Sequence, residues 1–247
     1  MSALVLALIA GAVVGLALGA LGGGGSVLAV PALIYLLGFS PSAATTASLV
    51  IVAATSATAL YAHARDGQVA WRAGSLFAAA GIIPAYFAGA AAGRVPEAAL
   101  TIAFSVIAAL AAVRMFRPSS SRPAERIRPG QAAGAGAGLG AVTGFLGVGG
   151  GFLAVPALVS VLGLTMRRAV GTSLLVITVN SLAGLIARTG NSGGLDWTLI
   201  GPFTGAAILG AWDGKRLSAK VSGNSLQRAF AGVLLAVAVF MVIDVIL

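Results

Sequence analysis

The chain alternates long apolar runs with short polar breaks, and the order of these runs occurs twice. The runs cover residues 4–21, 27–37, 43–62, 73–92 and 98–113 in the first half, and 131–146, 152–162, 169–187, 197–212 and 229–247 in the second. Runs of about 18 or more apolar residues predict bilayer-spanning helices, whereas runs of roughly 11 residues are too short to cross upright. We therefore predict an all-α polytopic membrane protein in which residues 27–37 and 152–162 form half-helices.

A glycine-rich stretch recurs at the start of each half. Residues 11–33 read GAVVGLALGALGGGGSVLAVPAL and residues 136–158 read GAGLGAVTGFLGVGGGFLAVPAL, with 14 of 23 positions identical at an offset of 125 residues. Glycines at every fourth position allow another helix backbone to approach closely. We expect such packing at Gly11, Gly15, Gly19, Gly136, Gly140 and Gly144.

Each copy then predicts a break in the helix. A cluster of glycines is followed by a proline, Pro31 or Pro156, inside the short apolar run. Glycine and proline both disfavour a helix interior, and Pro31 lacks the N–H that would bond the carbonyl near Val27. Broken helices of this kind line the substrate sites of membrane transporters.

The number of crossings predicts that the two halves run in opposite senses. Each half has five crossings if the short elements span, or three if they form re-entrant hairpins, and both numbers are odd. We therefore divide the chain into an N-terminal repeat (residues 1–113), a basic linker (114–130) and a C-terminal inverted repeat (131–247). Placing the arginine-rich linker in the cytoplasm, where basic residues gather, puts both termini outside.

Composition indicates lipid rather than nucleic acid as the surrounding partner. Hydrophobic residues make up 59% of the chain and charged residues 9%, against roughly 25% charged residues in soluble domains. The net charge of +9 lies in short loops between apolar runs, as expected for a membrane protein. Residues 4–21 lack a basic segment before them and recur in mid-chain, so we do not expect a cleaved signal peptide.

The chain lacks residues for most catalytic centres. It has no cysteine, one histidine (His63) and no GxxxxGK[ST] motif, which excludes thiolate chemistry and argues against a histidine metal centre or ATP hydrolysis. An intramembrane hydrolase would need a nucleophile–base pair, and His63 at the end of a span is a poor base candidate. We expect no enzyme activity, no metal and no cofactor.

The glycine clusters are the candidate substrate site. A helix that begins at Gly25 or Gly151 presents N–H groups without intrahelical partners, and its dipole adds positive potential. Two such starts, facing one another across a pseudo-two-fold axis, would hold an anion without a buried lysine or arginine. The predicted substrate-binding residues are Gly22, Gly23, Gly24, Gly25, Ser26, Gly147, Gly149, Gly150 and Gly151.

Polar side chains on the following spans are candidates to complete the site. They are Thr45, Thr46, Ser48, Thr172, Ser173 and Asn180. Hydroxyl groups in helices often bond to their own backbone, so each hydroxyl alone is a weak candidate. Asn180 is a stronger one, because an amide in hydrocarbon needs a partner.

Residues at the ends of the spans predict contacts with the membrane interface. We expect His63 to be an interfacial residue rather than a proton relay, and Asp213 to pair with Lys215 or Arg216 in a charged turn over residues 213–220. Tryptophans are common at membrane interfaces, so we expect to find three there: Trp71, Trp197 and Trp212.

The doubled glycine–proline signature and the segment GTSLLVITVNSLAG (residues 171–184) resemble the TauE/SafE family of sulfite and organosulfonate exporters, also called 4-toluene sulfonate uptake permeases. The resemblance implies a multi-pass carrier of small sulfur-containing anions in a bacterial or archaeal cell membrane. Ser26 stands where the second copy has Gly151, and Gly23 where it has Val148, so the two half-sites differ.

The leading hypothesis is a secondary anion transporter that works by alternating access. An anion channel that uses the same backbone site is the alternative; the sequence lacks the rings of charge common in channel filters. The sequence leaves open the exact anion, the direction of transport, coupling to protons or sodium, and homo-oligomerisation.

Overall fold

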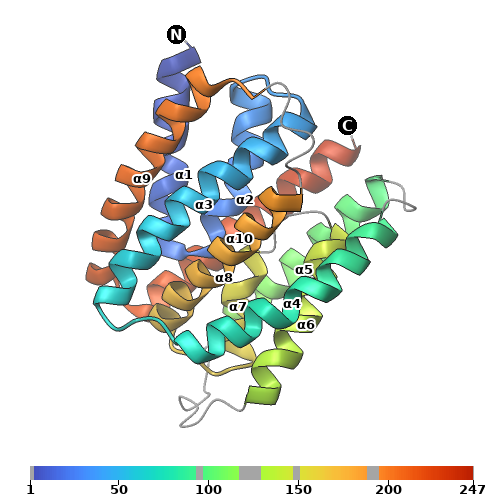
Figure 1. The fold of residues 1–247 in the computed structure, drawn as a ribbon, viewed down its shortest axis with the longest axis vertical. Coiled ribbons are helices and arrows are strands. Elements are labelled where there is room, and N and C mark those ends of the chain that lie inside the picture. Colours follow the sequence, from blue (N-terminus) through green and yellow to red (C-terminus); the bar gives the residue numbers. More distant parts are fainter. Residues whose placement is uncertain (1–2, 93–96, 117–128, 147–150, 188–194, 247) are drawn as a thin grey trace.

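The computed structural model describes residues 3–92, 97–116, 129–146, 151–187 and 195–246, and every regular element in these ranges is helical (Figure 1). The first half contains α1 (Ala3–Leu21), α2 (Gly23–Pro31), the π-helix η1 (Ala32–Leu36), α3 (Pro41–Arg65), α4 (Trp71–Ala92) and α5 (Glu97–Phe116). The second half contains α6 (Pro129–Leu146), α7 (Gly151–Ser160), α8 (Met166–Ala187), α9 (Trp197–Lys220) and α10 (Gly223–Ile246). This order confirms the predicted alternation of long and short helices.

The outer surface of the bundle is apolar. Among the described residues, four helices are long and apolar enough to cross a membrane: Ala3–Leu21, Ala43–Arg65, Met166–Ile186 and Gly223–Ile243. Large apolar side chains on α4 point outward, with Ile83 67%, Tyr86 73% and Phe87 68% exposed. Contiguous exposed apolar surface marks contact with lipid or protein, and with these spans it confirms the all-helical membrane protein.

The glycines at every fourth position form two seams of direct backbone packing. A Cβ atom built on Gly15 would lie 2.6 Å from the carbonyl carbon of Ala207, and one on Gly19 would lie 2.7 Å from that of Ala211. Gly136 and Gly140 meet Phe77 and Gly81 of α4 in the same way. The packing role predicted for these glycines is confirmed, and it joins α1 to α9 and α6 to α4; the environment of Gly144 lies outside the described residues.

Two further contacts between the halves join corresponding helices, α3 with α8 and α5 with α10. On α3 and α8, Leu49 lies against Gly184 and the Ser56 hydroxyl lies 2.9 Å from that of Thr178. Along this contact the residue numbers rise on α3 while they fall on α8, so the two helices are antiparallel. The Gln227 amide near the start of α10 donates to the Met115 carbonyl at the end of α5 over 2.7 Å, which is also an antiparallel contact.

The turns after the short helices have the same geometry in both halves. Gly38 (φ 70°) and Gly163 (φ 65°) adopt the left-handed conformation that glycine favours at a helix end. The next residue closes each turn: the Phe39 N–H bonds the Leu33 carbonyl at 3.0 Å, and the Leu164 N–H bonds the Leu158 carbonyl at 3.1 Å. Each pair of positions differs by the sequence offset of 125 residues, so the local structure repeats with the sequence.

Some predicted boundaries are wrong. The charged segment 213–220 is not a turn, because α9 continues through it to Lys220. Trp212 therefore lies within a helix, whereas Trp71 and Trp197 begin α4 and α9; all three side chains are exposed, and their place at the membrane interface stays a prediction. The helix expected at Gly25 begins at Gly23, and its end after Pro31 widens into η1. The missing N–H of proline removes one i→i−4 bond, which fits a π-turn at this point.

Figure 1 shows the start of α1 and the end of α10 at the upper end of the bundle. The connection between α3 and α4 and the end of α9 lie toward the opposite end. The linker, residues 117–128, is outside the described residues.

Candidate functional site

The first glycine cluster turns the chain back on itself. The Gly22 N–H bonds the Leu18 carbonyl at 2.8 Å and closes α1. Gly22 then has φ 69° and ψ −116°, a conformation that side-chain-bearing residues rarely adopt. A Cβ on Gly25 would collide with Leu18, so α2 folds directly against the helix that precedes it. Glycine is required here by both conformation and space.

The starts of α2 and α7 meet backbone to backbone. A Cβ on Gly23 would collide with the Gly151 carbonyl oxygen and would lie 2.6 Å from the carbonyl carbon and 2.9 Å from the Cα of Phe152. Gly23 and Gly151 begin these helices in the two halves of the chain. The structure thus brings together the starts of the two short helices, one at each predicted substrate-binding cluster. Gly147, Gly149 and Gly150 lie outside the described residues, as do the surroundings of Gly24 and Ser26.

One of the predicted hydroxyl groups reaches the first break. The Ser173 Oγ on α8 lies 2.5 Å from the position of a Cβ on Gly22, and it donates to the Val170 carbonyl over 2.8 Å. The neighbouring Thr172 hydroxyl donates to the Arg168 carbonyl at 2.6 Å and accepts the Ala70 N–H at 3.0 Å. Ser173 therefore lines the glycine break, whereas Thr172 holds the start of α4 against α8.

The remaining polar candidates lie further along α3 and α8. Thr46 and Ser48 are buried in the first turns of α3, and the Ser48 hydroxyl donates back to the Thr45 carbonyl over 2.8 Å. Asn180 is half-buried on α8, seven residues after Ser173, which is about 10 Å along a helix. Substrate binding by these four residues stays a prediction. Pro156 is buried within α7, and Pro31 is half-buried at the end of α2.

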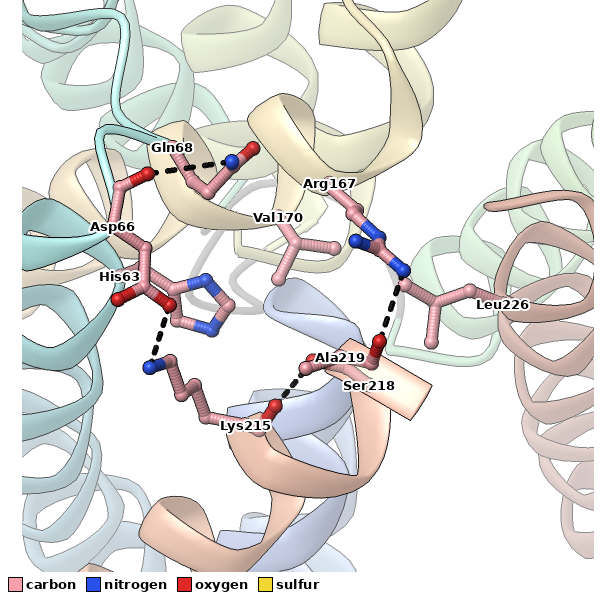
Figure 2. A pocket seen from close by; sticks show the side chains of 9 residues that line it. All are labelled: His63, Asp66, Gln68, Arg167, Val170, Lys215, Ser218, Ala219 and Leu226. Atoms are coloured by element: carbon pink, nitrogen blue, oxygen red, sulfur yellow. Dashed lines mark hydrogen bonds and ion pairs between the residues drawn. The ribbon is translucent and has the colours of Figure 1, made fainter. Parts of the chain in front are cut away.

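A small polar cavity lies next to the first glycine break (Figure 2). Its volume is about 60 Å³, and it is lined by His63, Asp66, Gln68, Arg167, Val170, Lys215, Ser218, Ala219 and Leu226. Val170 belongs to both places, because its carbonyl oxygen lies 3.2 Å and its Cα 3.4 Å from a Cβ on Gly22. One residue, Val170, therefore contacts the cavity on one side and the glycine break on the other.

Charged side chains tie together the helix ends around this cavity. The Lys215 ammonium of α9 lies 2.6 Å from a carboxylate oxygen of Asp66, just after α3. The Arg167 guanidinium donates to the Ala219 and Val221 carbonyls at the end of α9, both over 3.1 Å. The hydrogen bond from Lys215 holds the pKa of Asp66 below its ordinary value of 3.8.

Asp213 confirms the predicted pairing in this segment, and of the two predicted partners it is Arg216 that it contacts. Asp213 pairs with Arg216 at 3.5 Å, as predicted, and both side chains are 69% exposed. Lys215 instead points to the opposite wall of the cavity and pairs with Asp66. A helix places residues two apart on different faces, which is why Asp213 and Lys215 do not meet.

His63 is buried between helices rather than exposed on the surface of the bundle, and its place at the membrane interface stays a prediction. Its side chain is 5% exposed, and its Nε2 lies 3.1 Å from the Gly19 carbonyl oxygen on α1. A carbonyl can only accept a hydrogen bond, so Nε2 carries the hydrogen and Nδ1 is the atom that gains or loses a proton. The end of α1 packs beside α3 here and covers the imidazole.

The comparisons with known proteins identify the family. The model of the family described as "Sulfite exporter TauE/SafE" matches residues 7–241, nearly the whole chain. The chain belongs to the TauE/SafE family. A "Probable membrane transporter protein" of Xylella fastidiosa (strain 9a5c) is 34% identical over 241 residues, covering 94% of this chain and 92% of the relative. "Probable membrane transporter protein YunE" of Bacillus subtilis (strain 168) is 26% identical over 246 residues, covering 88% and 86%.

This TauE/SafE chain is accordingly a multi-pass membrane transporter with bacterial relatives, and not an enzyme. No solved structure gives a significant match. The resemblance seen in the glycine–proline signature is confirmed.

Sequence reasoning missed the polar cavity in this TauE/SafE protein. Its charged residues, Asp66, Arg167 and Lys215, come from three separate parts of the chain. The signal that pointed to them was their common side: all three lie at span ends that the distribution of basic residues places with the linker. That rule predicts that these residues lie on the same side of the membrane, but it does not predict which of them contact one another.

Proposed function

We propose that this protein is a secondary transporter of small sulfur-containing anions, sulfite or organosulfonates, and that it works by alternating access. The observation that carries the proposal is the contact between Gly23 and Gly151, the first residues of α2 and α7. The first turn of a helix presents N–H groups beyond the reach of its own carbonyls, and the helix dipole adds positive potential there. Two such starts at one place favour an anion.

The chemistry of this place suits a carrier. The proposed anion is held by backbone N–H groups in the first turns of α2 and α7, beside Gly22, and by the Ser173 hydroxyl when it turns away from the Val170 carbonyl, without a permanent charge in contact. A fixed cation in the membrane interior is costly and would slow the release of the cargo. The other predicted ligands are Gly24, Gly25, Ser26, Gly147, Gly149, Gly150, Thr45, Thr46, Ser48 and Asn180, while the hydrogen bonds of Thr172 favour a structural role for it.

The proposal includes two inverted repeats, residues 1–113 and 131–247, joined by a cytoplasmic linker (114–130), with both termini outside. The antiparallel contacts of α3 with α8 and of α5 with α10 support it, because these are corresponding helices of the two halves. The two glycine seams also support it. Helix α1 of the first half packs on α9 of the second, and the corresponding helix α6 of the second half packs on α4 of the first. Alternating access would then rock these closely packed helix pairs about the shared site.

The test is anion flux into proteoliposomes that contain the purified protein. Sulfite, sulfate, sulfoacetate and acetate are compared, each with and without a pH gradient. A carrier gives saturable uptake that is accelerated by the same anion preloaded inside, whereas a channel gives electrical currents without that acceleration. Absence of flux for every anion would overturn the proposed function, and dependence on a pH gradient would identify proton coupling.

A further inference from the structure

We propose that the polar cavity beside Val170 is a second anion-binding station, where Lys215 holds the anion and Asp66 competes for Lys215. The ligand class is a small inorganic oxyanion such as sulfite or sulfate. This inference rests on the proposed transport function, and it adds to it a binding place on the linker side of the glycine breaks.

The position of the cavity fits a step on the transport path. Val170 lines it, and the same residue packs against Gly22 at the first glycine break. Figure 2 shows the Val170 side chain directed into the cavity, between His63 and Arg167 on opposite walls. An anion in the cavity is therefore separated from the first glycine break by a single residue, Val170, whose carbonyl oxygen and Cα face Gly22.

The size of the cavity limits the ligand. A volume of about 60 Å³ is several times the roughly 10–15 Å³ that one water requires. The cavity has room for an ion of a few heavy atoms, such as sulfite. A bulky aromatic sulfonate would not fit without a rearrangement of the walls.

The charges of the lining residues favour an anion. Two cations, Lys215 and Arg167, face the cavity with a single carboxylate, Asp66. The two bonds of Arg167 to α9 carbonyls both leave from Nη2, and a guanidinium has further donors on Nε and Nη1. The Lys215 ammonium has three hydrogens, and Asp66 lies 2.6 Å away on one side of it.

Asp66 already occupies the place of an anionic ligand. Its carboxylate makes a short charge-assisted bond to Lys215, yet its side chain is 48% exposed and can turn into solvent. An arriving oxyanion would replace the carboxylate on Lys215, and the return of Asp66 would release the oxyanion. Such an exchange keeps binding weak enough for the ion to leave, a condition that ion pathways must meet.

Two single substitutions distinguish this station from a simple latch between α3 and α9. In proteoliposomes with sulfite as substrate, Lys215→Met should raise the KM about tenfold, the effect of one lost charge-assisted bond. Asp66→Asn should lower the KM, because Lys215 loses its competitor. If the pair were only a latch, both variants would break it and shift the KM in the same direction. That result would overturn the proposal.

The exposed pair Asp213–Arg216 on the same helix supplies the matched controls. Asp213→Asn and Arg216→Met change the same charges one turn or less from Lys215, outside the cavity, and should leave the KM unchanged. If Arg216→Met raised the KM as much as Lys215→Met, the effect would be one of surface charge in general, and this result would also overturn the proposed station. Gel filtration in detergent shows whether each variant is folded.

The station and the proposed transport function fail in different ways. If the wild-type protein moves no anion, the transport function fails. Sulfite binding to the detergent-purified protein by titration calorimetry still tests the station, with lost or weakened binding in Lys215→Met and stronger binding in Asp66→Asn expected. If wild-type flux is present and neither variant changes the KM or the binding, the station fails while the transport function stands. Sulfoacetate and 4-toluene sulfonate, tested beside sulfite, show whether the size limit holds.

Discussion

The contact between the two glycine breaks predicts a sharp effect of one added methyl group. In Gly23→Ala the new Cβ would lie 2.6 Å from the Gly151 carbonyl carbon. The two helix starts must move apart by more than 0.8 Å, the difference from an ordinary contact of 3.4 Å, because the Gly151 carbonyl oxygen lies closer still. Overpacking of this kind typically costs about 1–3 kcal/mol, which corresponds to roughly 2–4 °C of melting temperature per kcal/mol. We expect a modest loss of stability and a large loss of sulfite flux.

Gly15→Ala is the matched control for the steric effect. Its Cβ would also lie 2.6 Å from a carbonyl carbon, that of Ala207, but in the α1–α9 seam. Gly205→Ala in α9 controls for the substitution itself, since nothing lies within 4 Å of its Cβ and alanine favours a helix by about 1 kcal/mol. Both controls should retain flux when folded. Equal flux per folded molecule in Gly23→Ala and Gly15→Ala would refute a binding role for the glycine contact.

The other predictions concern single polar groups. Thr172→Val should lower stability by about 0.5–2 kcal/mol, the usual effect of losing a helix cap, without a change in KM, as measured by melting and flux. Asn180→Leu should weaken sulfite binding in calorimetry, and unchanged affinity would remove that side chain from the site. Because Lys215 lowers the pKa of Asp66, their pair stabilises the fold above pH 3.8 and loses its effect as the pH falls through the lowered pKa. The melting temperature of Asp66→Asn should therefore approach that of the wild type on acidification, and a constant difference would contradict the linkage. Since the chain has no cysteine, Ser119→Cys in the linker gives a single thiol, which should react with an impermeant maleimide only after the cells are opened.

The repeated glycines allowed much of the fold to be predicted. Spacing at every fourth residue correctly predicted close backbone packing for Gly15 and Gly19. It did not predict that their partner is α9, because small residues permit an approach by any helix of suitable shape. The offset of 125 residues correctly predicted matching turns at Gly38 and Gly163.

The charged regions were harder to predict. Residues 213–220 look like a polar turn, but α9 runs through them, and its charged side chains pair as Lys215 with Asp66 and Asp213 with Arg216. Long basic side chains can keep their charge in a polar place while the helix continues. His63 looked interfacial because Arg65 and Asp66 follow it. Its burial depends on the Gly19 carbonyl of α1, a tertiary contact that no local pattern encodes.

The candidate site was predicted only as far as backbone physics allows. The turn at Gly22 and the start of a short helix at Gly151 follow from glycine and proline preferences, and the contact of Gly23 with Gly151 across the halves is consistent with the expected symmetry. The sequence could not predict that Thr172 bonds the start of α4 while Ser173 lines the glycine break. Adjacent hydroxyl groups on one helix differ only in which residues pack against them.

The most direct test of the shared anion site uses Ser173→Cys as the only thiol in the chain. The Ser173 Oγ lies against Gly22, so a thiol there reports on the glycine break, and sulfur replaces oxygen with little change in shape. The rate of its reaction with a small, charged methanethiosulfonate reagent is measured in proteoliposomes with increasing sulfoacetate, because sulfite itself would consume the reagent. We predict that sulfoacetate slows the reaction, with half-protection near its KM for transport. A reaction rate that is independent of sulfoacetate, in a variant that still transports it, would contradict an anion site at the glycine breaks.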